Sequence, residues 1–182
     1  RAAQRRPGRA PVWVFGPRSG SKTEHFRIPA GLAPGALAEF LPLQVRRVES
    51  LRPGRRVSIH ADGQVIGHAL RWREFVEADA ALAIDARFDD GHPALLRHGA
   101  IRYVCADVDG DLLRGWLEQA AKDAGLRTRR LPDALRLRRR GNLQFAFNYG
   151  SEVLNLPFVP ESDCVLGSPE LPPAGVAAWV AS

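Results

Sequence analysis

Residues 12–29, VWVFGPRSGSKTEHFRIP, place an apolar run before glycines, a lysine and hydroxyl side chains, the residue types that hold phosphate in nucleotide-binding loops. A Walker A loop requires G-x-x-x-x-G-K-[ST], because successive backbone N–H groups wrap the phosphates and the lysine directly follows the second glycine. Here three residues separate Gly16 from Gly20, and one more precedes Lys22. The following residues are too rich in Pro and Gly to form the helix that should face the phosphate. We therefore predict a long surface loop over 16–34, after a strand, and no nucleotide site.

Cysteine and histidine show no metal-ligand spacing anywhere in the sequence. The two cysteines, Cys105 and Cys164, both lie among apolar residues, so we expect free, buried thiols rather than a disulfide framework. No C-x-x-C or H-x-x-x-H pair occurs among these cysteines and the five histidines: His25, His60, His68, His92 and His98. We therefore predict neither a metal site nor a cofactor site.

The net charge of +6 comes almost entirely from arginine, since Lys22 and Lys122 are the only lysines. Such a balance permits an acidic partner. A functional basic patch has no reason to exclude lysine, however, so we interpret the bias as a property of composition. No uncharged apolar run approaches the ~18 residues of a membrane span, and we expect no membrane partner.

Residues 136–147 come close to the RNP1 signature of RNA-binding sheets, with Arg140-Gly141 and a final Phe147 in place. Asn142 and Gln144 occupy two positions where that signature has aromatic rings for base stacking. We therefore predict an ordinary strand pair and no nucleic-acid partner, with nucleic-acid binding kept as a weaker alternative. In this interpretation Leu143, Phe145 and Phe147 form a core face, and the solvent face carries Arg136, Arg138 and Arg140.

The first part of the chain mixes strand patterns with one clear helix. The helix has Leu112, Trp116 and Ala120 on an apolar face with Leu113, Leu117, Ala121 and Ala124, and we expect Asp109 and Gly125 at its ends. Upstream we predict a buried strand at 11–15, a short helix over 36–41, and strands at 44–49, 55–60, 64–75, 80–88, 93–97 and 100–106.

The pattern changes near Leu131-Pro132-Asp133. Beyond this point there are only short strand patterns with turn signals, at 135–140, 143–149, 153–156, 164–166 and 176–181. We therefore predict two domains, residues 1–130 and residues 131–182, the second a small antiparallel β domain.

Four segments together resemble the C-terminal third of β-galactosidases of glycoside hydrolase family 42. They are VFGPRSGSKTEHFRIPAGLAPG (14–35), FDDGHPALLRHGAIRYVC (88–105), LRLRRRGNLQFAFNYG (135–150) and LGSPELPPAGVAAW (166–179). The resemblance implies an α/β plus all-β chain: part of a doubly wound, flavodoxin-like or glutamine-amidotransferase-like trimerisation domain, followed by a small β domain. It also implies that Arg1 to Arg6 end a helix, that a catalytic barrel of the same polypeptide lies upstream, and that the parent forms a homotrimer.

The resemblance further implies a retaining hydrolase whose two catalytic glutamates lie on the absent barrel. Retaining hydrolysis needs two carboxyl groups about 5–5.5 Å apart. No position here matches either glutamate motif, so we assign no catalytic residue and expect this chain alone to be inactive. The remaining acids fall in turns or on exposed faces and are interpreted as structural: Glu39, Asp62, Asp89, Asp90 and Glu118.

The alternative function is a free-standing carbohydrate-binding or accessory β module. Exposed aromatic rings would favour it, yet the four tryptophans all lie in apolar patterns: Trp13, Trp72, Trp116 and Trp179. The chain starts at Arg1 without Met or an apolar signal region, so we expect a fragment of a longer protein. A cytoplasmic location is the default expectation.

Overall fold

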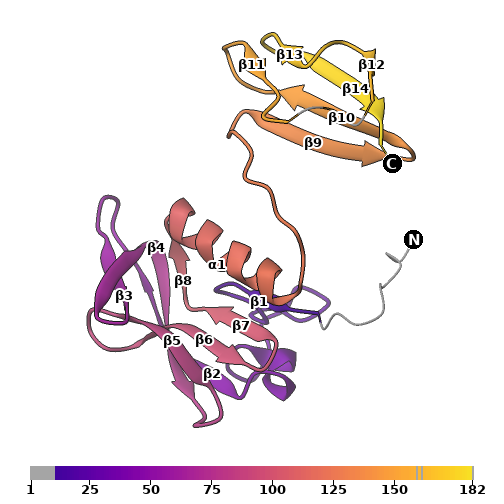
Figure 1. The fold of residues 1–182 in the computed structure, drawn as a ribbon. Coiled ribbons are helices and arrows are strands. Elements are labelled where there is room, and N and C mark those ends of the chain that lie inside the picture. The colour runs from indigo at the N-terminus through magenta and orange to yellow at the C-terminus, as the bar shows by residue number, and fades with distance from the viewer. Residues whose placement is uncertain (1–10, 159, 161, 182) are drawn as a thin grey trace. The chain divides into compact units, whose positions relative to one another are not determined.

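The computed structural model describes residues 11–158, 160 and 162–181. The chain folds into two compact units, one ending at Thr128 and the other beginning at Arg129 (Figure 1). The predicted helix end at Arg1 to Arg6 lies outside the described residues. No helix in the described part of the chain is long and apolar enough to cross a membrane.

The first unit is built on one eight-stranded sheet. Its strand order is β1-β7-β6-β5-β3-β4-β2, and β8 pairs separately with β4. The strands are β1 (Trp13–Phe15), β2 (Leu43–Ser50), β3 (Val57–Ala61), β4 (Gln64–Ala78), β5 (Ala83–Phe88), β6 (Pro93–His98), β7 (Ile101–Val104) and β8 (Ala106–Val108). The predicted strands over residues 11–97 are thus confirmed, with shifted ends, whereas the single strand predicted at 100–106 is two strands, β7 and β8, separated by Cys105. The unit also contains a short 3₁₀ helix, η1 (Gly35–Glu39), and one α-helix, α1 (Gly110–Asp123).

Only the β1–β7 pair is parallel among the strand pairs of the described residues; the others are antiparallel. The fold is therefore predominantly β, with α1 packed near β1 and β4 (Figure 1). The prediction of a buried strand at 11–15 is wrong in its burial, because Trp13 is 55% exposed. The reason is that β1 lies at one end of the strand order, where it is covered less than the central strands.

Local sequence signals place the turn and the helix as predicted. Asp62 and Gly63 join β3 to β4 with φ values of 49° and 76°, the two positive angles that a tight hairpin turn requires. Asp109 caps α1, where its Oδ1 accepts a 3.0 Å hydrogen bond from the Leu112 N–H. Gly125 follows the helix with a φ of 65°, and its N–H donates to the Lys122 carbonyl.

The apolar face of α1 is covered along only one side. Leu112 and Ala120 are buried and Trp116 packs against the core, but Leu113 and Leu117 are 39% and 46% exposed. The predicted apolar face is therefore only partly buried, because the helix packs on β1 and β4 with one edge of that face.

The core of the first unit lies between the sheet strands, α1 and the segment around η1. Its most deeply buried large side chains include Leu41, Ile59, Phe88, Leu96 and Tyr103.

Both cysteines are free thiols, as predicted. Cys105 belongs to the core, and burial raises the pKa of its thiol. Cys164, in the second unit, is only half-buried, so the prediction of burial is wrong for this residue. The reason is its position on β12, which lies at one end of the strand order of its sheet.

The second unit contains short strands and no described helix. Its four-stranded sheet has the order β12-β14-β10-β9, and a separate pair joins β11 to β13. The strands are β9 (Leu135–Arg140), β10 (Leu143–Asn148), β11 (Leu154–Asn155), β12 (Cys164–Leu166), β13 (Glu170–Leu171) and β14 (Val176–Val180). The sequence did not predict β13, which is only two residues long.

The predicted core face of β10 is wrong. The buried side chains are Ala146 and Asn148, whereas Phe145 and Phe147 lie on the opposite, half-buried face. Leu135, Leu171, Ala177 and Trp179 already fill the core, which leaves room for only small side chains from β10. Because Phe145 pairs with Arg138 and Phe147 with Arg136, the aromatic rings and the exposed arginines share one sheet face.

Candidate assembly interface

The long loop after β1 is anchored by a buried carboxylate that the sequence interpretation missed. Glu74, on β4, is 2% exposed and accepts a 2.7 Å hydrogen bond on Oε1 from the Arg18 backbone N–H. Its other oxygen accepts a 2.7 Å bond from the Tyr103 hydroxyl on β7. The Trp72 indole N–H lies 3.4 Å from Oε1, and the Arg18 guanidinium stacks 5.0 Å from the Trp72 ring centroid.

These contacts meet the requirement that a buried carboxylate be hydrogen-bonded. Burial, together with the neighbouring Glu74, raises the pKa of the Tyr103 hydroxyl well above its ordinary value. Tyr103 therefore remains a neutral donor, which keeps Glu74 satisfied and the start of the loop tied to the sheet.

The start and the end of the loop are in close contact at Gly20 and Pro34. Gly20 has a φ of 70°, and a Cβ on this residue would collide with the carbonyl oxygen of the buried Pro34. Directly before Pro34, the Ala33 carbonyl accepts a 2.8 Å hydrogen bond from the Val45 N–H on β2, which ties the end of the loop to the sheet. The base of the loop is thus held by packing and hydrogen bonds.

The tip of the loop presents apolar side chains to the surface. Thr23 closes a turn around Phe26 through a 3.1 Å bond from the Arg27 N–H to its side chain and a 2.9 Å bond from the Phe26 N–H to its carbonyl. Phe26 is 86% exposed and has a φ of 58°, a strained conformation for a bulky residue. Ile28 is 80% exposed, and Leu32 and Phe40 also lie at the surface. A rigidly based loop with exposed apolar residues at its tip is typical of an interaction surface.

A second charge cluster on the same sheet is centred on the buried Arg73. The Arg73 guanidinium binds Glu49 and Asp90, the latter at 2.7 Å, and stacks on the Phe75 and Phe88 rings with centroid distances of 4.6 and 5.3 Å. Burial opposes ionisation of Asp90, but the bonds from Arg73 and the His92 backbone prevail and lower its pKa.

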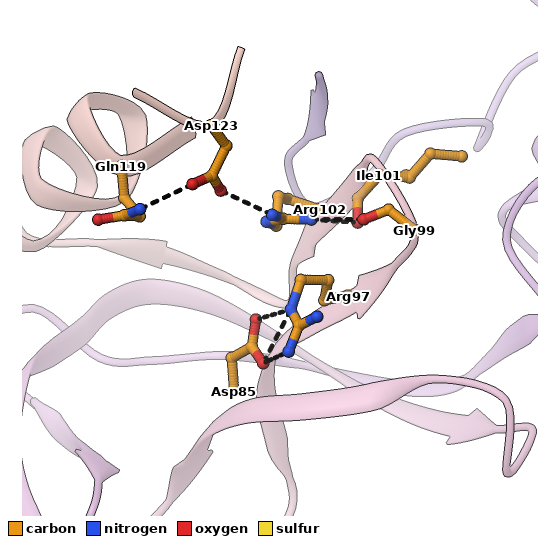
Figure 2. A network of polar contacts seen from close by, with 7 residues as sticks. All are labelled: Asp85, Arg97, Gly99, Ile101, Arg102, Gln119 and Asp123. Carbon is orange, nitrogen blue, oxygen red and sulfur yellow. Dashed lines mark hydrogen bonds and ion pairs between the residues drawn. The ribbon is translucent and has the colours of Figure 1, made fainter. Parts of the chain in front are cut away.

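A groove of about 550 Å³ lies between α1 and the sheet, with an apolar floor that includes Val14, Leu95 and Trp116. Figure 2 shows two ion pairs at this groove: Arg97 bridges both Asp85 oxygens at 2.9 to 3.2 Å, and Arg102 binds Asp123 at 2.8 Å.

One residue of each ion pair has a shifted pKa. Asp85 raises the pKa of Arg97, while bonds from Gln119 and Arg102 lower the pKa of Asp123. The Arg102–Asp123 pair joins β7 to α1, whereas the Arg97–Asp85 pair joins β6 to β5 within the sheet. Among the described residues, the charged side chains that line the groove are thus paired with one another.

The acids singled out from the sequence do not converge on one site. Glu39, Asp62, Asp89 and Glu118 are exposed, and Asp90 pairs with Arg73. In the described part of the chain, no group of three or more His, Cys, Asp or Glu residues could hold a metal ion. Glu74 could have been noticed only as an acid at a strand position that alternates with the apolar residues Trp72 and Val76.

Comparison with known proteins gives consistent matches. Residues 9–127 match the sequence model of a family described as the β-galactosidase trimerisation domain. A β-galactosidase of Thermus thermophilus is 45% identical over 175 residues, covering 96% of this chain and 26% of that protein.

Solved structures agree. The crystal structure of a β-galactosidase from the psychrophilic Marinomonas ef1 has a TM-score of 0.79 and 38% identity, covering 94% of this chain and 26% of that one. A polyextremophilic β-galactosidase from Halorubrum lacusprofundi has a TM-score of 0.74 and 26% identity, with 93% and 27% covered. The chain thus spans about a quarter of the length of the relatives it matches.

Proposed function

This chain belongs to the β-galactosidase trimerisation domain family, and we propose that it is the non-catalytic assembly and support region of a β-galactosidase that hydrolyses terminal β-D-galactosides. A catalytic barrel in the same polypeptide supplies the two carboxyl groups that retaining hydrolysis requires. The chain contributes subunit contacts, and the parent assembles as a homotrimer.

The loop tip carries this proposal. Phe26 and Ile28 are the two most exposed large apolar side chains among the described residues, and Phe26 is held in a strained conformation by a closed turn. Burial of these side chains against a neighbouring subunit would stabilise the assembly by about 25 cal/mol for each Å² of apolar surface removed from water. The Glu74 anchor fixes the loop before association, so little further ordering entropy opposes binding.

The parallel β1–β7 pair supports a finer proposal about the fold. The outer edge of β1 has no partner strand in the described part of the chain, and an unpaired edge readily adds another strand. We propose that the sheet extends beyond β1 with further parallel strands, which together form a doubly wound, flavodoxin-like or glutamine-amidotransferase-like domain. In this arrangement residues 1–130 are the later part of the trimerisation domain and residues 131–182 are a C-terminal β domain.

The test is the oligomeric state of the longer polypeptide, measured by light scattering with and without changes at the loop tip. Phe26→Asn with Ile28→Ser removes the apolar surface, and Asn tolerates a positive φ, so the monomer fold should persist. Val65→Ser is the matched control, since Val65 is 55% exposed but lies in β4.

We expect a trimer for the unchanged protein and for the control, and dissociation for the double variant. A parent that is monomeric, or a double variant that remains as trimeric as the control, would overturn the proposed interface.

A further inference from the structure

A small pocket in the second unit is built around the end of β10. It has a volume of about 410 Å³ and is lined by residues 147–150 on one side and residues 173–175 on the other. This lies within the ~300–1,000 Å³ typical of small-molecule sites.

Buried Asn148 fixes both walls of the pocket. Its side-chain N–H groups donate to the carbonyls of Glu152, Leu171 and Pro172 at 2.7 to 3.0 Å. Its Oδ1 accepts a 2.8 Å hydrogen bond from the Gly150 N–H. With its carboxamide oxygen and nitrogen both engaged, Asn148 serves as a brace for the pocket, not as a ligand contact.

Close packing of two glycines holds the same walls. A Cβ on Gly150 would lie 2.9 Å from the Ala134 Cβ, and one on Gly175 would lie 2.7 Å from the Pro172 carbonyl oxygen. Ala174, between Pro173 and Gly175, has a φ of 56°, a strained value for a residue with a Cβ. The pocket is therefore formed in advance of any ligand, and strain is stored at its rim.

Tyr149 provides an exposed ring at this rim. It is 76% exposed and stands at the end of an aromatic row, 6.4 Å from the Phe147 ring, which in turn lies 6.2 Å from Phe145. Its backbone N–H bonds to the Ala134 carbonyl, which fixes the base of the side chain. Its hydroxyl bonds to no other group of the described residues.

Among the described residues, no charged side chain lines the pocket, so its chemistry suits a neutral ligand with one apolar face and a polar rim. A pyranose ring has this form, with C–H groups on one face and hydroxyls at its edge. We propose that this pocket is an accessory binding site for a galactopyranose unit, stacked on Tyr149 with its hydroxyls toward the Gly150 and 173–175 backbone. The choice of galactose among neutral sugars rests on the proposed function.

The arginines beside the aromatic row suggest single-stranded nucleic acid as the competing ligand, since such sites combine stacking rings with a basic track. Two observations disfavour it. Phe145 and Phe147 stack on each other at an interplanar angle of 17°, which leaves Tyr149 as the only ring of the row classed as exposed. The guanidiniums of Arg136 and Arg138 donate to backbone carbonyls of their own strand region.

The experiment is a titration of the 182-residue chain with methyl β-galactopyranoside, followed by amide NMR. No catalytic glutamate of the family is expected in this chain, so an active site cannot contribute to the signal. We expect weak, saturable binding, with a Kd on the order of 1 mM, and shifts concentrated at Tyr149, Gly150, Ala174 and Gly175.

Three variants make the result specific. Tyr149→Ala should weaken binding by about tenfold or more, Tyr149→Phe should retain it because the ring remains, and Phe26→Ala should leave it unchanged. Unchanged amide signals of Ala177 and Trp179, which are buried in the core of the second unit, confirm that this unit is folded in each variant.

Several outcomes would overturn the site: no saturable shift, shifts centred elsewhere, equal binding by Tyr149→Ala, or loss of binding in Tyr149→Phe. Salt-dependent binding of a short single-stranded DNA at these residues, without sugar binding, would assign the surface to nucleic acid instead. None of these results alters the trimer test in the longer polypeptide, so the two proposals can fail separately.

Discussion

The Tyr103 hydroxyl donates a 2.7 Å hydrogen bond to Glu74 Oε2 in the interior of the first unit, where Tyr103 is 0% and Glu74 is 2% exposed. This bond joins β7 to β4 across the strand order, and the other Glu74 oxygen holds the Arg18 backbone. The loop proposed as the subunit contact is therefore tied to the sheet through one carboxylate.

Replacing Tyr103 by Phe should lower the free energy of unfolding by about 1–3 kcal/mol, because a buried carboxylate oxygen loses its donor. Chemical denaturation of the chain measures this loss. Tyr149→Phe is the matched control and should change stability little, since Tyr149 is 76% exposed. Equal stability of Tyr103→Phe and the unchanged chain would contradict the role assigned to this bond.

The same residue predicts an alkaline limit to stability. Burial and Glu74 raise the pKa of Tyr103 in the folded state, whereas an unfolded tyrosine titrates near about 10. The contribution of Tyr103 is therefore fully present below about pH 10 and is lost as the pH rises above that value toward the folded pKa.

Ultraviolet titration of tyrosinate tests this limit. While the chain remains folded, its absorbance change should equal that of Tyr103→Phe, because Tyr103 stays protonated. A larger native-state change in the unchanged chain, with no unfolding, would show that Tyr103 ionises readily.

Arg73→Met should be far more costly than Arg46→Met. The Arg73 side chain is 11% exposed, whereas the Glu49 and Asp90 side chains that it binds are 38% and 37% exposed. Its replacement loses these bonds and the packing on Phe75 and Phe88, and water can hydrate the two carboxylates, so we expect a cost of about 1–3 kcal/mol. The Arg46–Glu77 pair is largely exposed, with side chains 52% and 66% accessible, and should contribute less than about 1 kcal/mol. Thermal unfolding of both variants gives the comparison, and similar losses would rule out a special role for Arg73.

The chain by itself should not hydrolyse a chromogenic galactoside. Retaining hydrolysis needs an acid and a nucleophile on opposite sides of one sugar, and the acids highlighted in the sequence lie apart in turns and on exposed faces. The assay compares purified chain at high concentration with a mock purification. Turnover that rises with protein concentration and disappears on substitution of a single Asp or Glu in residues 1–182 would contradict this expectation.

Local sequence determined much of this chain by itself. The Asp62-Gly63 hairpin, the Asp109 cap and the Gly125 end of α1 follow from short-range backbone requirements, and each lies where the sequence predicts it. Most strand segments of both units were also predictable, because turn residues and apolar alternation are read within a few positions, but β13 and the division between β7 and β8 were not. The character of residues 16–34 as a loop followed from the density of Pro and Gly in the same way.

Only the tertiary structure decided which faces are buried. In β10 the larger side chains predicted the wrong core face, because Leu135, Leu171 and Trp179 from other segments fill the interior and leave space for Ala146 and Asn148. The Glu74 anchor was equally hidden, since its partners Arg18 and Tyr103 lie 56 and 29 residues away along the chain. Which face of a strand is buried depends on the side chains that distant segments place against it. The alternation of apolar residues within one strand contains no information about those segments.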